Sequence, residues 1–318
     1  MNAIQTESLT KKFGDLCAVD GLTLGVNKEV FGLLGPNGSG KTTTVLMLTT
    51  LLSQTKGSAS ICGHDTVREP DRVRSCISYV PQDMAVDTYL TGRENMLFFA
   101  RLYGVANPKD RVDELLAVMG LSERADDLAK TYSGGMRRRL ELAEALVHEP
   151  EVIFLDEPTL GLDVGARKII WDHIHALSRK GMTIFVTTHY MDEADQFCDR
   201  IGIIDHGKIA ALGSPSELKS RLMKDVIKVV VEGDYSPVQP DGTRFIARSG
   251  DEISFTADNG REALPLLAAA LSRAGNRVRA MSLCEPSLDD VFLQFVGRQE
   301  EPQGFEELKF RVMLRRRS

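Results

Sequence analysis

The glycine-rich stretch GPNGSGKTT, residues 35–43, constrains the fold of this 318-residue chain more than any other feature. Its first eight residues fit the spacing G-x-x-x-x-G-K-[ST], in which a loop between a strand and a helix cradles phosphates with its backbone N–H groups. The apolar run VFGLLG ends in this stretch, and TTTVLMLTTLL follows with the apolar spacing of a helix. The context predicts a nucleotide-binding α/β fold. The alternative is a glycine-rich turn that binds no ligand.

The residue types of this loop predict how it binds a nucleotide. Glycines allow the backbone to approach an anion closely, because a Cβ would block that approach. Lys41 is expected to reach the β- and γ-phosphates, and Thr42 is expected to bind Mg²⁺. The expected phosphate-binding residues are Gly35, Pro36, Asn37, Gly38, Ser39, Gly40, Lys41, Thr42 and Thr43.

Two further apolar runs of strand length end in residues suited to catalysis. VIFLDE ends in Asp156 and Glu157, and TIFVTTH ends in His189. Ligands of open α/β sheets bind at the carboxyl ends of the strands. We therefore expect Asp156 to complete the Mg²⁺ shell, Glu157 to polarise an attacking water, and His189 to contact the γ-phosphate or that water. The alternatives are solvated carboxylates at a strand exit and an incidental hydrogen-bonding histidine.

The pattern of elements predicts two domains and a tail. Apolar strands alternate with helices over residues 1–222, which predicts a sheet covered on both faces. Within it, residues 87–146 are predicted to be helical, and TGRE at 91–94 is a capping-box pattern. Residues 226–298 predict a small α+β domain. Residues 299–318 are predicted to form a linker and a basic tail. The tail is either an amphipathic helix on a membrane surface or a solvated end of the chain.

Composition narrows the class of protein. The net charge of −6 and the absence of a broad basic patch argue against a nucleic-acid partner. Five scattered cysteines without CxxC spacing argue against a zinc site or a disulfide framework. The sequence has no signal-peptide pattern and no apolar run long enough to span a bilayer. A cytoplasmic location is expected, and any membrane role would need a partner.

The combined motifs resemble one family. GPNGSGKTT, Gln82, YSGGM, VIFLDEPT, GLD and His189, in this order and spacing, are similar to the nucleotide-binding subunit of an ABC transporter. The resemblance covers roughly residues 1–222. It implies a P-loop ABC ATPase core with a mixed sheet and a helical subdomain, ATP and Mg²⁺ as cofactors, and a homodimer. Two subunits of this family pack head to tail, with each ATP between the cradle of one and the Ser-Gly-Gly of the other.

The resemblance also implies roles for individual residues. Ser133, Gly134 and Gly135 would contact the ATP of the partner subunit, and Asp163 would link the two ATP sites. Phe13 would stack on adenine. Gln82 would join Thr42 and Asp156 at the metal and act in catalysis with Lys41, Glu157 and His189. The alternatives are a helix N-cap for Ser133, a turn aspartate and a core phenylalanine.

One departure from the family pattern lies in YSGGM, where Met136 stands in place of the usual glutamine. Hydrolysis is still expected, because the serine and the glycine amides remain. Three arginines, Arg137–Arg139, follow on successive faces of the predicted helix, so at most one can face a ligand. The other two are interpreted as solvated or salt-bridged.

A narrower resemblance points to efflux. YSGGMRRRLELA, TTHYMDEAD and PSLDDVF are similar to the daunorubicin-resistance type of ABC ATPase. This implies export of a drug or another amphipathic, lipid-like substrate through a separate transmembrane subunit, with the ATPase on the inner face of the membrane. The segment after Gln82, through about Tyr103, would receive a helix of that subunit. The alternatives are a soluble ABC-type ATPase acting on ribosomes or DNA, and a non-catalytic nucleotide-binding regulator.

Overall fold

The structure is a computed structural model that describes residues 2–220, 225–232, 235–238, 240–284, 287–289 and 291–292. The predicted tail and most of the predicted final helix, residues 286–297, lie outside these ranges. The chain divides into two compact units, residues 1–215 and 216–318, and each is described by itself.

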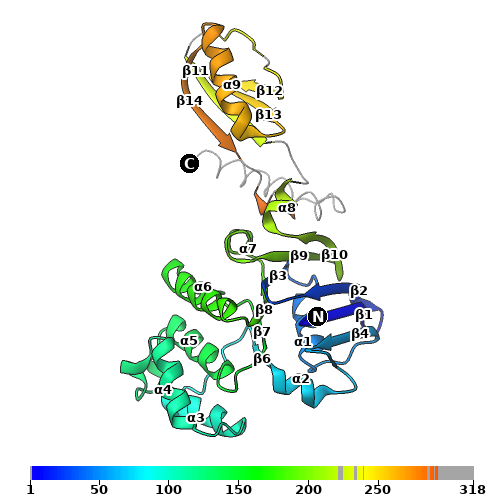
Figure 1. Cartoon of the computed structure of the whole chain (residues 1–318), viewed down its shortest axis with the longest axis vertical. Coiled ribbons are helices and arrows are strands. Elements are labelled where there is room, and N and C mark those ends of the chain that lie inside the picture. The colour runs from blue at the N-terminus through cyan, green and yellow to red at the C-terminus, as the bar shows by residue number, and fades with distance from the viewer. Residues whose placement is uncertain are drawn as a thin grey trace. The chain divides into compact units, whose positions relative to one another are not determined.

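A six-stranded sheet forms the centre of the first unit (Figure 1). Its strands run in the order β10-β9-β3-β8-β7-β6, and all neighbours are parallel except the hairpin β9–β10. Every residue of β3, β7 and β8 is buried, as a parallel sheet covered on both faces requires. The strands are β3 (Val30–Leu34), β6 (Ile77–Val80), β7 (Val152–Asp156), β8 (Thr183–Thr188), β9 (Arg200–Asp205) and β10 (Lys208–Gly213).

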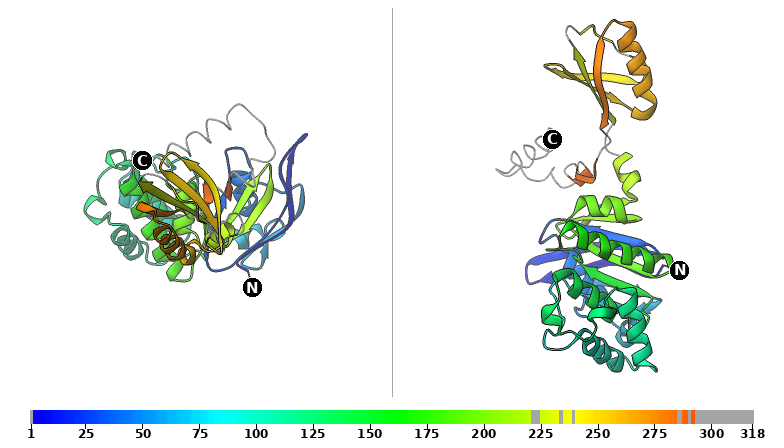
Figure 2. Two further views of the ribbon diagram at one scale, coloured as in Figure 1. Left: turned by 90° about the horizontal axis from the view of Figure 1, so that it is seen from above. Right: turned by 90° about the vertical axis from the view of Figure 1, so that its left-hand side faces the viewer.

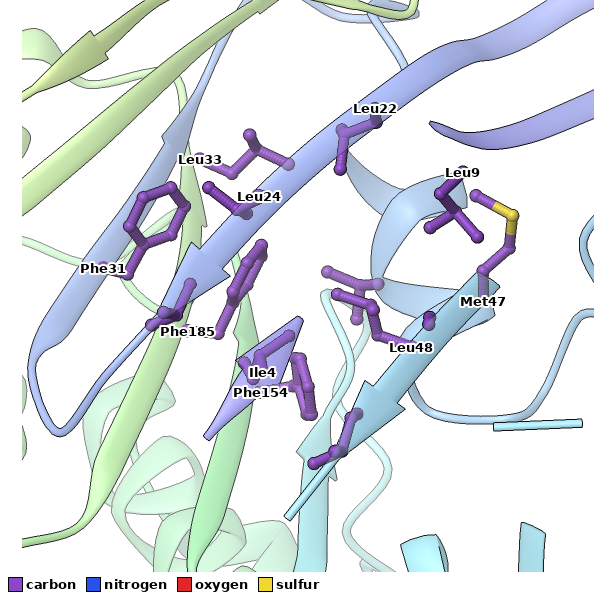
Figure 3. Packing of buried hydrophobic residues seen from close by; sticks show 14 of the residues in the cluster. Ile4, Leu9, Leu22, Leu24, Phe31, Leu33, Met47, Leu48, Phe154 and Phe185 are labelled. Carbon is purple, nitrogen blue, oxygen red and sulfur yellow. The ribbon is translucent and has the colours of Figure 1, made fainter. Parts of the chain in front are cut away.

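A second, antiparallel sheet has the order β2-β1-β4-β5. Its strands are β1 (Ile4–Phe13), β2 (Leu16–Val26), β4 (Lys56–Ile61) and β5 (His64–Asp65). Helix α1 (Lys41–Leu48) contacts β2 and β4 of this sheet and β7 of the central sheet. Figure 3 shows the resulting core, in which side chains of the antiparallel sheet and of α1 meet phenylalanines of the central sheet. This core fixes α1, and with it the loop that precedes α1.

The predicted helical part is present. Thr91 caps α3 in a complete capping box with Glu94, which confirms the sequence pattern. Helices α3, α4 and α5 contact one another, and α5 also contacts α6 and β6. The helices of the first unit are α1, α2 (Pro70–Cys76), α3 (Gly92–Leu102), α4 (Pro108–Val118), α5 (Gly134–Ala145), α6 (Val164–Arg179) and α7 (Met191–Phe197), and α8 (Pro215–Ser220) follows at the division.

The second unit contains a four-stranded antiparallel sheet with helix α9 on one face (Figure 2). Alternate residues of β11 and β13 are buried, and Leu267 and Leu271 of α9 pack against them. This arrangement is the predicted α+β architecture. The elements are β11 (Asp225–Glu232), β12 (Thr243–Ser249), β13 (Glu252–Ala257), α9 (Gly260–Arg273) and β14 (Arg277–Cys284).

Helix α5 carries a buried carboxyl group, that of Glu144. Its Oε1 has no hydrogen-bond partner within the described ranges. Burial, together with the nearby charge of Glu141, raises the pKa of Glu144 from 4.5 to about 8. The folded chain therefore holds this proton at a pH where the unfolded chain has released it.

This proton makes the stability of the first unit dependent on pH. The contribution of Glu144 to the free energy of unfolding is fully present below about pH 4.5, where the carboxyl group is protonated in both states. It is lost as the pH rises from there through about 8. We expect Glu144→Gln to abolish this pH-dependent loss of stability. At pH 8 the free energy of unfolding of the variant should then exceed that of the parent by up to roughly 1.4 kcal/mol for each unit by which folding raises the pKa. Denaturant unfolding at pH 5 and pH 8 measures this. The exposed Glu123→Gln is the control, and an equal pH dependence in both variants would contradict the prediction.

Candidate active site

The parallel register of the central sheet brings four predicted sites together. Because β3, β8, β7 and β6 are neighbours and run in one direction, their carboxyl ends lie at the same edge of the sheet. Strand β3 leads into the loop at Gly35, and β8 leads to His189. Strand β7 ends at Asp156, next to Glu157, and β6 is followed by Pro81 and Gln82. Residues far apart in the chain thus meet by topology.

The loop between β3 and α1 is held close to neighbouring backbone. Gly40 caps α1 with a φ of 107°, and a Cβ there would lie 2.4 Å from the carbonyl oxygen of Ala18. A Cβ on Gly35 would lie 2.3 Å from the carbonyl oxygen of Ile204. Only glycine fits at these two positions, because a side chain at either would overlap neighbouring backbone. Ser39 is buried beside it, and its Oγ has no partner in the described part of the chain.

Lys41 places a buried positive charge over this loop. Its side chain is 5% exposed, and its Nζ donates to the carbonyl oxygens of Gly35 at 2.8 Å and Pro36 at 3.2 Å. The same Nζ lies 3.4 Å from Oε1 of Glu157. The ammonium group therefore joins the loop to the end of β7.

Asp156 supplies a buried carboxylate that is only half satisfied. The hydroxyl of Thr187, on the neighbouring strand β8, donates to its Oδ1. Its Oδ2 is buried and has no hydrogen-bond partner among the described residues. A free carboxylate oxygen at this edge suits a hard cation, for which the exposed hydroxyl of Thr42 and amide of Gln82 are further oxygen donors. The residues present therefore fit Mg²⁺.

Glu157 lies between two cationic or ionisable groups. Its Oε2 is 2.8 Å from Nδ1 of His189, and its Oε1 faces Lys41. The backbone of Glu157 has a φ of +47°, which is uncommon for a residue other than glycine. Its N–H donates to the carbonyl oxygen of Thr187 at 3.2 Å and to Oγ1 of Thr187 at 3.0 Å. This backbone conformation directs a 7% exposed carboxylate toward the cradle.

A second group of predicted residues meets at the starts of α5 and α6. Ser133 caps α5 by accepting from the N–H of Met136 at 3.2 Å, so its N-cap alternative is realised. Asp163 caps α6 by accepting from the N–H of Ala166 at 2.9 Å. Both side chains line a hollow of about 340 Å³, together with Gly135. Gly134 is the first residue of α5.

Phe13 lies at the end of β1 and is not a core residue. Its side chain is 48% exposed, and Nζ of Lys11 lies 5.0 Å from the centre of its ring. The plain core alternative for this phenylalanine is therefore wrong.

A hollow of about 660 Å³ lies at the opposite, amino-terminal edge of the central sheet. Glu151, which precedes β7, and Thr183, the first residue of β8, line it. None of the predicted site residues is among its lining residues in the described chain.

Two residues of the site escaped sequence reasoning. Thr187 was hidden inside an apolar strand, although a threonine two positions before His189 is a usable signal. The run Arg137–Arg139 predicts that at most one arginine faces a ligand, but no local pattern indicates which one. Arg138 is directed toward this edge of the sheet: it is buried, salt-bridged to Glu141, and its Nη2 donates to the carbonyl oxygen of Asp156 at 3.2 Å.

The other two arginines of the run are also partly buried. Nη1 of Arg139 donates to the carbonyl oxygen of Met119 at 2.7 Å, and Nε of Arg137 is inaccessible to solvent. The prediction for these two arginines left solvation and salt bridges open, and neither side chain is fully solvated. The reason is that α5 packs against α3, α4 and α6, which leaves little of its surface open.

Comparisons with known proteins agree with the fold. Residues 19–160 match the family model described as ABC transporter, and residues 213–296 match the C-terminal domain of DrrA1-3-like ATP-binding proteins. The chain is 43% identical over 316 residues to the daunorubicin/doxorubicin resistance ATP-binding protein DrrA of Streptomyces peucetius, with 96% of each chain covered. It is 35% identical to the linearmycin resistance ATP-binding protein LnrL of Bacillus subtilis, with 93% of this chain and 98% of that protein covered.

Solved structures give the same result for the first unit. An ATP-binding subunit of an ABC transporter matches 69% of this chain and 92% of its own, at a TM-score of 0.63 and 26% identity. A dimeric ATP-binding cassette in a post-hydrolysis state, bound to ADP and Pi, matches 66% of this chain and 98% of its own, at a TM-score of 0.60 and 26% identity.

Replacing Thr187 tests the link between the two carboxylates. Thr187→Val keeps the shape but leaves Asp156 Oδ1 without its hydroxyl donor and removes one acceptor of the Glu157 N–H. We expect ATP turnover to fall by roughly tenfold or more, since a buried polar group without its partner costs about 1–3 kcal/mol. ATP affinity should change less, because the loop at Lys41 is untouched. Thr183→Val, a buried threonine at the other end of β8, is the control, and equal turnover in the two variants would contradict the prediction.

Proposed function

Because the chain belongs to the ATP-binding proteins of ABC transporters, we propose that it is the ATP-hydrolysing subunit of an exporter whose membrane-spanning part is a separate protein. The observation that carries the proposal is the Glu157 carboxylate, held between Lys41 and His189 at the edge where the loop at Gly35 begins. A catalytic base, a cationic phosphate contact and a polar orienting group thereby converge on one point.

The chemistry proposed for the site follows from these contacts. Residues 35–43 bind the phosphates of ATP through backbone N–H groups, and Lys41 neutralises charge on the β- and γ-phosphates. Mg²⁺, held by Thr42, Gln82 and Asp156, would neutralise further phosphate charge. Glu157 accepts a proton from the attacking water, and His189 holds its carboxylate in place. Phe13, exposed at the end of β1, offers its ring to adenine.

We further propose that the active form is a head-to-tail homodimer. Ser133 caps the twelve-residue helix α5, so the positive end of the helix dipole lies at the hollow that Ser133, Gly135 and Asp163 line. The first N–H groups of the helix, those of Gly134 and Gly135, have no acceptor within the helix. An anion suits this place, and the γ-phosphate of ATP in the partner's cradle supplies one. The dimeric cassette among the structural relatives supports this assembly.

A membrane partner is proposed because relatives along nearly the whole chain are ATP-binding proteins of resistance and export systems. The described part of the chain contains no helix that is both long and apolar enough to cross a bilayer. Between Gln82 and Tyr103, five large apolar side chains are exposed, and Tyr89 is 84% exposed. The other four are Met84, Phe98, Leu102 and Tyr103. Such a surface suits an apolar helix of the membrane subunit. This chain would then lie on the inner face of the cell membrane.

The proposed substrate class is a drug or another amphipathic, lipid-like compound. The support is that relatives along nearly the whole chain are resistance proteins for daunorubicin, doxorubicin and linearmycin, and that another is the Nod factor export ATP-binding protein I of Cupriavidus metallidurans, at 38% identity. No nucleic-acid partner is proposed.

Trapping the ATP-bound state tests the proposed site and assembly. Glu157→Gln should bind ATP but hydrolyse it slowly, so the protein should become a dimer in saturating MgATP, as measured by light scattering. Lys41→Ala should stay monomeric, because it loses the cation that contacts the phosphates. A Glu157→Gln protein that remains monomeric under these conditions would refute head-to-tail assembly of the isolated subunit.

The same trap tests the exporter proposal. Tagged Glu157→Gln protein is purified from detergent-solubilised membranes of its own cells in the presence of ATP. A polytopic membrane protein should copurify, and Lys41→Ala should recover less of it. Ribosomal or DNA-associated proteins in its place would favour the soluble ATPase and would contradict export.

A further inference from the structure

Arg138 of helix α5 connects three parts of the active site. Its side chain is 3% exposed. Nη1 donates to the carbonyl oxygen of Pro81 at 2.8 Å, Nε to that of Pro158 at 3.0 Å, and Nη2 to that of Asp156 at 3.2 Å. The planar guanidinium therefore spans the residue before Gln82 and the two residues that flank Glu157.

Glu141, one turn further along α5, completes the connection. Its Oε2 lies 2.9 Å from Nη1 of Arg138, and the pair is buried. Its Oε1 accepts from the N–H of Ala85 at 2.6 Å. The segment that contains Gln82 is thus held on one side through Pro81 and on the other through Ala85, and both contacts lead to the same two side chains.

The stability of the fold alone does not explain why the buried ion pair of Arg138 and Glu141 is present. Removing two charges from water costs several kcal/mol per ion, and apolar residues of similar size are often as stabilising. The pair does something apolar residues cannot do, because it fixes the relative position of backbone segments from β6, β7 and α5. Those segments carry Gln82, Glu157 and, at the start of α5, Ser133.

We propose that Arg138 and Glu141 are positioning residues that hold the Gln82 segment against the end of β7, and that they set the rate of ATP hydrolysis rather than the affinity for ATP. The inference rests on the ATPase site proposed above. The loop at residues 35–43 is held in place by Lys41, whose Nζ donates to two of its carbonyl oxygens. Nucleotide binding by this loop therefore does not depend on Arg138 and Glu141.

A double variant tests this without leaving a buried charge unpaired. Arg138→Met with Glu141→Gln removes the three donations to carbonyl oxygens but keeps an acceptor for the Ala85 N–H. ATP affinity, measured by calorimetry in EDTA, should stay within about threefold of the parent. The kcat of ATP hydrolysis should fall at least about tenfold, because only interactions needed for the reaction geometry are lost.

The chain offers a control pair of the same spacing, but more exposed to solvent, in α4. Arg111 and Glu114 have the same i,i+3 spacing and a 2.8 Å contact, and Nη2 of Arg111 donates to the carbonyl oxygen of Leu146 at 3.0 Å. Their contacts lie at the far end of α5 from Ser133. Arg111→Met with Glu114→Gln should therefore leave both kcat and ATP affinity within about twofold of the parent.

A conservative variant separates geometry from charge. Arg138→Lys keeps the positive charge beside Glu141, but a single ammonium cannot reach all three carbonyl oxygens in the fixed geometry of a guanidinium. Its kcat should remain at least about fivefold below the parent. Full recovery by lysine would overturn the positioning role and leave only a charge effect. Should the double variant not fold, Arg138→Lys decides the question by itself: a lowered kcat with unchanged ATP affinity supports the positioning role, and a kcat equal to that of the parent overturns it.

The remaining outcomes distinguish this inference from the site on which it rests. If Lys41→Ala binds ATP as the parent does, the cradle assignment fails. If Lys41→Ala loses ATP but the Arg138 double variant keeps the parent's kcat, or loses kcat and ATP affinity to the same degree, the site stands and the positioning role is wrong.

Discussion

The parallel pairing of β3, β8, β7 and β6 is the constraint on which the rest of the first unit depends. It gives the carboxyl ends of these strands one common edge, and side chains separated by more than a hundred residues meet there. The pairing requires apolar strands covered on both faces, which the helices and the antiparallel sheet provide. The aromatic core of Phe31, Phe154 and Phe185 therefore serves the site indirectly, because it holds the strands in register.

Site residues that follow directly from a local sequence pattern could be predicted, and those that depend on contacts distant in the sequence could not. The loop at 35–43, Asp156 with Glu157, and His189 each come directly after an apolar run, so the sequence alone places them at strand ends. Arg138 and Thr187 act through contacts with residues 18–57 and 31 positions away, respectively. No local pattern contains such distances. The fold class was predictable for the same reason as the strand ends, since it follows from alternation along the chain.

Helix α5 joins two surfaces that otherwise belong to different sites. Its first turn, capped by Ser133, lies at the hollow that Asp163 lines, and its next turn carries Arg138 toward Pro81 and Asp156. A helix of twelve residues is a stiff connection over this distance, so a displacement of its first turn moves the guanidinium as well. The three arginines lie on successive faces of the helix, and this difference of direction lets one of them, Arg138, reach the edge of the sheet at Asp156.

The charges buried at this edge do not balance. Asp156, Glu157 and Glu141 are three carboxylates, whereas Lys41 and Arg138 are two cations, and all five side chains are buried. Lys41 and Arg138 contact Glu157 and Glu141, and Thr187 reaches one oxygen of Asp156, which leaves Asp156 Oδ2 without a donor in the described chain. A buried carboxylate oxygen in that condition is costly unless a cation binds it. The imbalance is therefore the physical argument for a divalent cation at Asp156, and it locates the proposed metal more firmly than the exposed Thr42 and Gln82 can.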